Sequence, residues 1–68
     1  MKMTIELNGE PYAVEAGTTV AALVEELKLK PKRVAVEINQ AVVPKADYDR
    51  VALNPGDHVE VINFVGGG

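Results

Sequence analysis

The residues best suited to chemistry in this chain stand at its end. Three consecutive glycines, residues 66–68, follow the apolar residues Ile62, Phe64 and Val65. Disordered termini are normally polar, so this order predicts a strand that carries a flexible, side-chain-free tail and its carboxylate into solvent. Glycine has no Cβ and adopts any φ, and three extended residues reach about 10 Å. Such a tail can enter a narrow slot in another protein, although a merely frayed end is the alternative.

The other candidate groups predict less. His58 is the single histidine and has no serine or cysteine nearby in the sequence, so we expect a solvated side chain and not a base. Asp47, Asp49 and Asp57 do not have the spacing of a calcium loop, and turn capping or loop solubility explains them better. The chain has no cysteine, which excludes disulfides and cysteine-held metal clusters. We therefore predict no catalytic residue, no metal site and no bound cofactor.

Length and composition narrow the class of protein. The 68 residues make one domain with a small core, which leaves little room for a deep active site. The net charge is −3, which disfavours nucleic acid and anionic membranes as partners. No signal peptide or long apolar run stands in the sequence, so we expect a cytoplasmic protein.

Two periodicities predict the elements. Apolar residues alternate in several segments, as in half-buried strands, and one segment has them at the i, i+3, i+4, i+7 spacing of a helix. The expected order is strands 1–7 and 10–15 joined by an Asn8-Gly9 turn, a helix capped by Thr18 or Thr19 and stopped by Pro31, a strand 33–38, a short strand 41–43, one helical turn within 45–50, a turn 54–57 and a last strand 58–65.

This order predicts an α+β fold of the β-grasp, or ubiquitin-like, type. The first and last strands pair in parallel at the centre of a mixed sheet, and the single main helix packs on one face. Residues 1–65 form the domain and residues 66–68 the flexible glycine tail. Parity places Ile62 and Phe64 on the open face, and we predict that these two residues and Val65 contact a partner. The alternative is a central strand that is covered on both faces.

Several segments carry a specific likeness. The segments VEINQAVVPK and LNPGDHVEVINFV, the helix AGTTVAALVEEL and the closing GGG resemble the sulfur-carrier proteins of thiamine biosynthesis, the ThiS family. The likeness runs from Met3 to Gly68. It departs at Gly66, which makes a third glycine, and at Tyr48, where a tryptophan is often found. Neither departure touches the terminal Gly67-Gly68.

The resemblance implies a carrier that is a co-substrate of other enzymes and not an enzyme itself. An adenylating enzyme, which uses ATP, would activate the Gly68 carboxylate as an acyl-adenylate. A sulfur donor such as a cysteine desulfurase would then supply the sulfur of a thiocarboxylate, and thiazole synthase would receive it. In this scheme Gly66, Gly67 and Gly68 thread the active sites of the partner enzymes.

Other functions fit part of the same pattern. The small subunit of molybdopterin synthase, a carrier for another sulfur-containing metabolite, a ubiquitin-type protein modifier and a passive β-grasp interaction domain are the alternatives. The basic stretch KLKPKR contains Lys28, Lys30, Lys32 and Arg33. We interpret it as the end of the helix, where cations suit the helix dipole; the alternative is an electrostatic docking patch for the activating enzyme.

Overall fold

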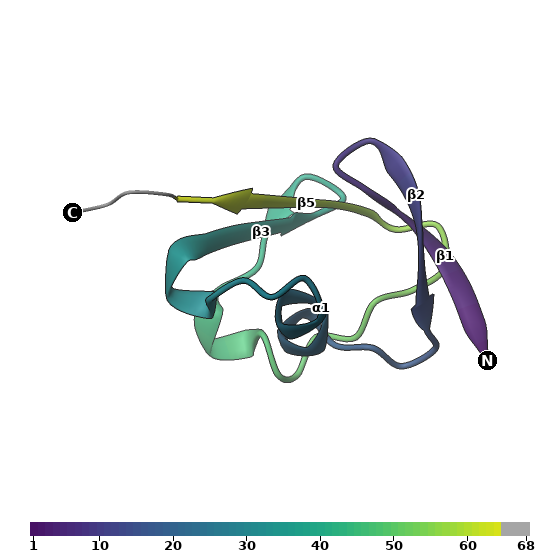
Figure 1. Ribbon diagram of the computed structural model, residues 1–68, viewed down its shortest axis with the longest axis horizontal. Helices are drawn as coiled ribbons and strands as arrows, with labels where there is room; N and C mark the ends of the chain where they lie inside the picture. Colours follow the sequence, from purple (N-terminus) through teal and green to yellow (C-terminus); the bar gives the residue numbers. More distant parts are fainter. Residues whose placement is uncertain (65–68) are drawn as a thin grey trace.

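A five-stranded sheet with one helix on one of its faces makes up the protein (Figure 1). The computed structural model describes residues 1–64. In chain order the elements are β1 (Lys2–Leu7), β2 (Glu10–Glu15), α1 (Val20–Glu26), the 3₁₀ turn η1 (Pro31–Arg33), β3 (Val34–Ile38), β4 (Ala41–Val42), the 3₁₀ turn η2 (Lys45–Asp47) and β5 (His58–Asn63). This is the α+β, β-grasp arrangement that the sequence predicts.

The sheet has the strand order β2-β1-β5-β3-β4. β1 and β2 form an antiparallel hairpin through Asn8 and Gly9, which have φ values of 51° and 85° as the turn requires. β1 and β5 pair in parallel at the centre, with Glu6 opposite His58 and Leu7 opposite Val59. The predicted central parallel pair is therefore confirmed.

The helix begins as predicted but ends earlier. The Thr19 hydroxyl caps it by accepting a hydrogen bond from the Ala22 N–H at 3.1 Å. The helix ends at Glu26 and does not continue to Pro31. Lys28 adopts a φ of 61°, and the Leu29 N–H donates to the Val24 carbonyl at 3.1 Å, which closes a Schellman motif. The cap geometry ends the helix, so the proline is not what stops it.

The core lies between α1 and the sheet. Its buried side chains are Ile5, Val14, Val20, Leu23, Val24, Val34, Val36, Val43, Tyr48, Leu53, Val59 and Val61. Tyr48 lies in a polar stretch of the sequence and was not expected inside, yet it is only 4% exposed. Burial raises the pKa of Tyr48, and a backbone contact with Val36 lowers it in part. The tyrosine therefore enters the core as the neutral phenol.

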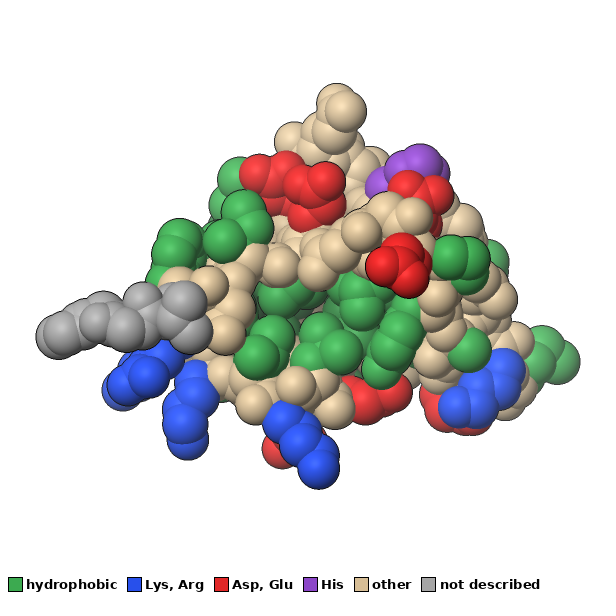
Figure 2. Space-filling view, turned by 45° about the horizontal axis from the view of Figure 1, so that its top comes forward, with side chains coloured by type: hydrophobic (Ala, Val, Ile, Leu, Met, Phe, Trp, Pro, Cys, Tyr) green, Lys and Arg blue, Asp and Glu red, His purple; other side chains and the backbone are tan. Residues whose placement is uncertain are grey.

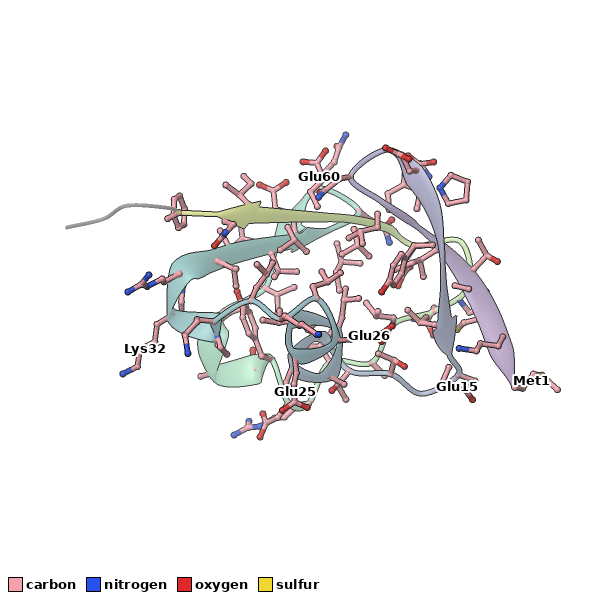
Figure 3. The ribbon with its side chains drawn as sticks, viewed as in Figure 1. Met1, Glu15, Glu25, Glu26, Lys32 and Glu60 are labelled. Carbon is pink, nitrogen blue, oxygen red and sulfur yellow. The ribbon has the colours of Figure 1, made fainter. Side chains whose placement is uncertain are left out.

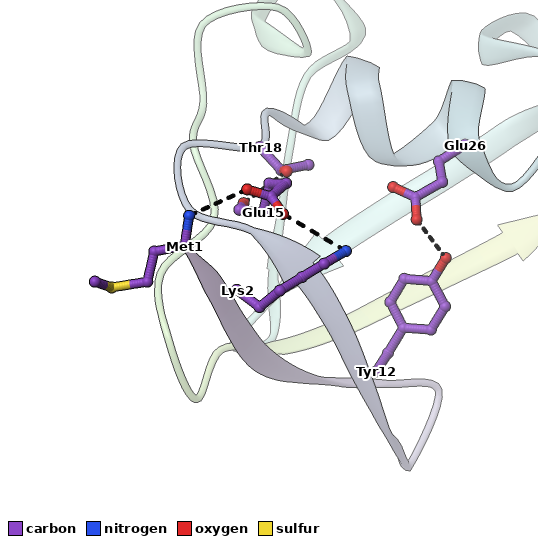
Figure 4. A network of polar contacts seen from close by, with 6 residues as sticks. All are labelled: Met1, Lys2, Tyr12, Glu15, Thr18 and Glu26. Atoms are coloured by element: carbon purple, nitrogen blue, oxygen red, sulfur yellow. Dashed lines mark hydrogen bonds and ion pairs between the residues drawn. The ribbon is translucent and has the colours of Figure 1, made fainter.

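Polar contacts join the two strands of the hairpin to each other and the hairpin to α1 (Figure 4). The Glu15 carboxylate receives the N-terminal amine at 3.2 Å and the Lys2 ammonium at 3.6 Å. The Tyr12 hydroxyl donates to the Glu26 carboxylate of α1 at 2.9 Å. That hydrogen bond, followed by burial and the Glu26 charge, raises the pKa of Tyr12.

None of the helices found in residues 1–64 has the length and apolar character needed to span a membrane.

Candidate functional site

The end of β5 leads to the glycine tail. The strand was expected to reach Val65 but ends at Asn63. One further hydrogen bond follows beyond its pairing with β3, because the Phe64 N–H donates to the carbonyl of Arg33, the last residue of η1, at 2.6 Å. Val65 and the glycines 66–68 lie outside the described residues, so their predicted roles stay predictions. Phe64 is thus the last described residue before the tail.

The open face of the sheet carries an apolar patch at this end. Val59 and Val61 are 1% and 8% exposed and face α1, whereas Ile62 is 49% and Phe64 56% exposed. Val42 of β4, which the sequence did not single out, is 70% exposed. We call Val42, Ile62 and Phe64 the apolar patch. The exposure of these hydrophobic side chains is compatible with the predicted partner contact, which stays a prediction. The alternative of a strand covered on both faces is wrong for the described residues.

Two acidic side chains adjoin the apolar patch. Glu37 of β3 lies directly opposite Glu60 of β5, and Val42 of β4 lies opposite Glu37 on its other side. Figure 3 shows Glu60 on the side of β5 that faces away from α1. Like charges placed directly across a strand pair repel each other. This pair therefore does not serve the stability of the sheet.

The other end of β5 carries polar side chains with structural roles. His58 is exposed, and its Nδ1 lies 3.4 Å from a Glu6 carboxylate oxygen on the neighbouring strand. The Asp57 carboxylate accepts hydrogen bonds from the Asn54 N–H at 2.8 Å and from the Asn39 side chain at 3.1 Å. The predicted turn-capping role of Asp57 is confirmed. Within residues 1–64 no group of three acidic or histidine side chains could hold a metal ion.

The edge of β5 is completed by a side chain. After β1 ends at Leu7, the Asn8 side chain accepts from the Val61 N–H at 2.9 Å and donates to the Val61 carbonyl at 3.4 Å. The Asn8 amide thus takes the place of a further residue of β1. The hairpin turn was predicted, but this second role of Asn8 was not.

The basic segment, which we define as Lys28, Lys30, Lys32 and Arg33, lies at the same end as the tail. The helix has no basic residue in its last turn, so the predicted match to the helix dipole is not supported. The segment instead runs through η1 to the Arg33 carbonyl that binds Phe64. On the face of the molecule that Figure 2 shows, several acidic side chains lie in the upper part and Lys and Arg side chains lie along the lower edge. Hydrophobic side chains lie between them.

Comparison with known proteins agrees with this fold. The model of the ThiS family matches residues 5–68. The chain belongs to the ThiS family. A crystal structure of the thiamine biosynthesis protein ThiS from Geobacter metallireducens superposes with a TM-score of 0.82 at 33% identity, and the match covers 97% of this chain and all of that one.

Two curated relatives of this ThiS-family chain differ in length. The sulfur carrier protein ThiS of Bacillus subtilis is 35% identical over 65 residues, which cover 94% of this chain and 98% of that protein. A thiazole synthase of Magnetococcus marinus is 50% identical over 66 residues, which cover 97% of this chain. The chain spans only 20% of the length of that thiazole synthase.

Proposed function

We propose that this protein is a sulfur carrier whose Gly68 carboxylate is the carrying group. The observation that supports the proposal most directly is the ThiS-family match, which runs through the final glycine. The relative in Bacillus subtilis, which this chain matches over almost its full length, is named a sulfur carrier. The small core and the exposed apolar patch agree with a protein that presents a group to other proteins.

The chemistry begins with activation of the carboxylate. A carboxylate is a poor acyl donor, because its oxygen is a poor leaving group. An oxygen of the Gly68 carboxylate attacks the α-phosphorus of ATP in the activating enzyme, pyrophosphate leaves, and an acyl-adenylate forms. A donor such as a cysteine desulfurase carries the sulfur as a persulfide, whose terminal sulfur attacks the acyl carbon and displaces AMP. A thiol then reduces the resulting acyl disulfide, so that the donor leaves as a mixed disulfide and the sulfur stays on the carrier. The product is a thiocarboxylate, whose soft anionic sulfur is a nucleophile.

Thiazole synthase is the proposed acceptor of the sulfur. The support is the thiazole synthase of Magnetococcus marinus, one fifth of which is 50% identical to this chain. In this scheme the carrier is a co-substrate and its partners are the catalysts. The apolar patch would then contact these partners while the glycines occupy their active sites. The tail of glycines has no side chain to exclude it from a narrow site.

An exchange assay tests the activation step. The protein is incubated with the activating enzyme of its host, ATP and labelled pyrophosphate, and incorporation of label into ATP is measured. We expect exchange with the full sequence and none after deletion of Gly68, because the carboxylate then lies about 3.5 Å short of its position.

The matched control keeps the length of the tail. A chain with a C-terminal amide on Gly68 retains every residue but lacks the carboxylate oxygen that attacks ATP. We expect no exchange with the amide and an unchanged melting temperature for both variants, since residues 1–64 are intact. Exchange with either variant would contradict the proposal.

A further inference from the structure

Positive charge is segregated in this acidic protein. The basic segment holds four of the seven Lys and Arg residues, and no Asp or Glu occurs from residue 27 to residue 36. The rest of the chain therefore carries three Lys or Arg against ten Asp or Glu. All four side chains of the segment are exposed. In residues 1–64 none of them lies in an ion pair, whereas Lys2 and Arg50 do.

The segment adjoins the root of the tail. The Arg33 carbonyl accepts the hydrogen bond of the Phe64 N–H at 2.6 Å. Figure 3 shows Lys32 projecting from the end of the domain at which β5 ends. A shallow hollow of about 630 Å³ lies between α1 and the segment, with Ala22 and Leu29 among its apolar residues and Lys30 among its basic ones. Two of the four cations, Lys28 and Lys30, thus border this partly apolar surface, which Glu25 borders as well.

The length of the tail limits how far a partner can stay from this surface. Four residues follow Phe64, and four extended residues reach at most about 14 Å. An enzyme that holds Gly68 must therefore bring part of its surface close to Phe64 and Arg33. Because Arg33 belongs to the basic segment, the charges next to the entrance of that enzyme's active site face these cations.

We propose that the basic segment docks on an acidic rim of the activating enzyme and assists its approach when ATP is bound. This inference rests on the proposed function. The Gly68 carboxylate and the triphosphate of ATP are both anions, and the remainder of the carrier is acidic as well. Cations at the root of the tail offset this repulsion and speed the encounter. Nucleic acid or an anionic membrane fits less well, because the rest of the surface would repel either.

A pair of double variants with equal net charge tests the proposal. Lys32→Gln with Arg33→Gln removes two charges of the basic segment. Lys2→Gln with Arg50→Gln removes two charges elsewhere, from side chains in exposed ion pairs. Lys45 is left unchanged, because its Nζ donates to the Val34 carbonyl at 2.9 Å. The KM and kcat of each carrier are measured in the pyrophosphate exchange reaction at low and at high salt.

We expect the first double variant to raise the KM for the carrier about tenfold at low salt. This difference should shrink at high salt, where screening is stronger, while kcat is unchanged. The second double variant should stay within about twofold of the original protein. Thermal unfolding of both confirms that they fold.

Other outcomes separate the two proposals. Equal KM values for the two double variants would overturn the docking inference and leave the proposed function in place. Lack of exchange by the original sequence, with an activating enzyme that is competent on another carrier, would overturn both. Binding of the original protein to single-stranded DNA or phosphatidylserine vesicles, lost only in the first double variant, would assign the segment to that ligand and overturn the docking inference.

Discussion

The two ends of β5 differ in how they are paired and in how far their side chains are exposed. At its start the chain is fixed on both sides, by β1 and by side chains: the His58 N–H donates to the Asn39 side chain at 2.9 Å, and Val59 is buried. At its end β5 keeps its pairing with β3, and Ile62 and Phe64 leave half of their surface exposed. Stability is thus concentrated at the start of the strand, and the end is available for a partner.

Substitutions on the two ends of this one strand should give the largest contrast in stability. Val59→Ala removes buried methyl groups and leaves a cavity, so we expect the free energy of unfolding to fall by about 2 kcal/mol. That is a large part of the roughly 3–5 kcal/mol available to so small a core. Ile62→Ala, on the exposed face, should change it by less than about 0.5 kcal/mol. Urea unfolding of both variants measures the difference; equal losses would remove the distinction between the two ends.

The affinity for a partner, in contrast to stability, should depend on the exposed residues at the end of β5. Phe64→Asp places a charge in the apolar patch, and we expect the Kd for thiazole synthase to rise about 10- to 100-fold with the fold intact. Ala13→Asp is the matched control, because Ala13 pairs with Thr4 on the distant hairpin and is also exposed. Titration calorimetry measures the affinity of both variants. If the two affinities were the same, Phe64 would not belong to the interface.

The acidic pair beside the patch should give the smallest effect. Glu37→Gln removes the repulsion from Glu60 across the strand pair, and we expect the free energy of unfolding to rise by about 0.2–1 kcal/mol. Glu10→Gln, in the exposed hairpin, is a control of the same chemistry. A loss of stability in Glu37→Gln would show that the pair has a structural function that its geometry does not indicate.

The sequence predicts the fold well where local signals agree with the tertiary structure. The alternation of Met3, Ile5 and Leu7, the Asn8-Gly9 turn and the apolar stripe of the helix were enough to place β1, β2 and α1. The parallel pairing of β1 with β5 followed from the order of the elements. The exposure of Ile62 and Phe64 followed from parity with the buried Val59 and Val61.

Features that depend on packing or on pairing between strands were not predicted. Tyr48 stands among charged residues, so only the tertiary structure shows that it enters the core. Lys28 was expected inside the helix, since a lysine gives no signal for the left-handed conformation that ends α1. Val42 joins the apolar patch because β4 pairs with β3, a register that two strand residues cannot predict alone. The position of the basic segment beside Phe64 depends on the same sheet.

The central claim is that the last carboxylate of this chain carries sulfur, and the intact mass of the protein tests it most directly. The protein is incubated with the activating enzyme of its host, ATP, a cysteine desulfurase with cysteine, and a thiol reductant, and its mass is then measured. The account predicts an increase equal to the replacement of one oxygen atom by sulfur, confined to the C-terminal fragment. An unchanged mass in the presence of a competent activating enzyme, or attachment of the tail to lysine residues of other proteins, would contradict it.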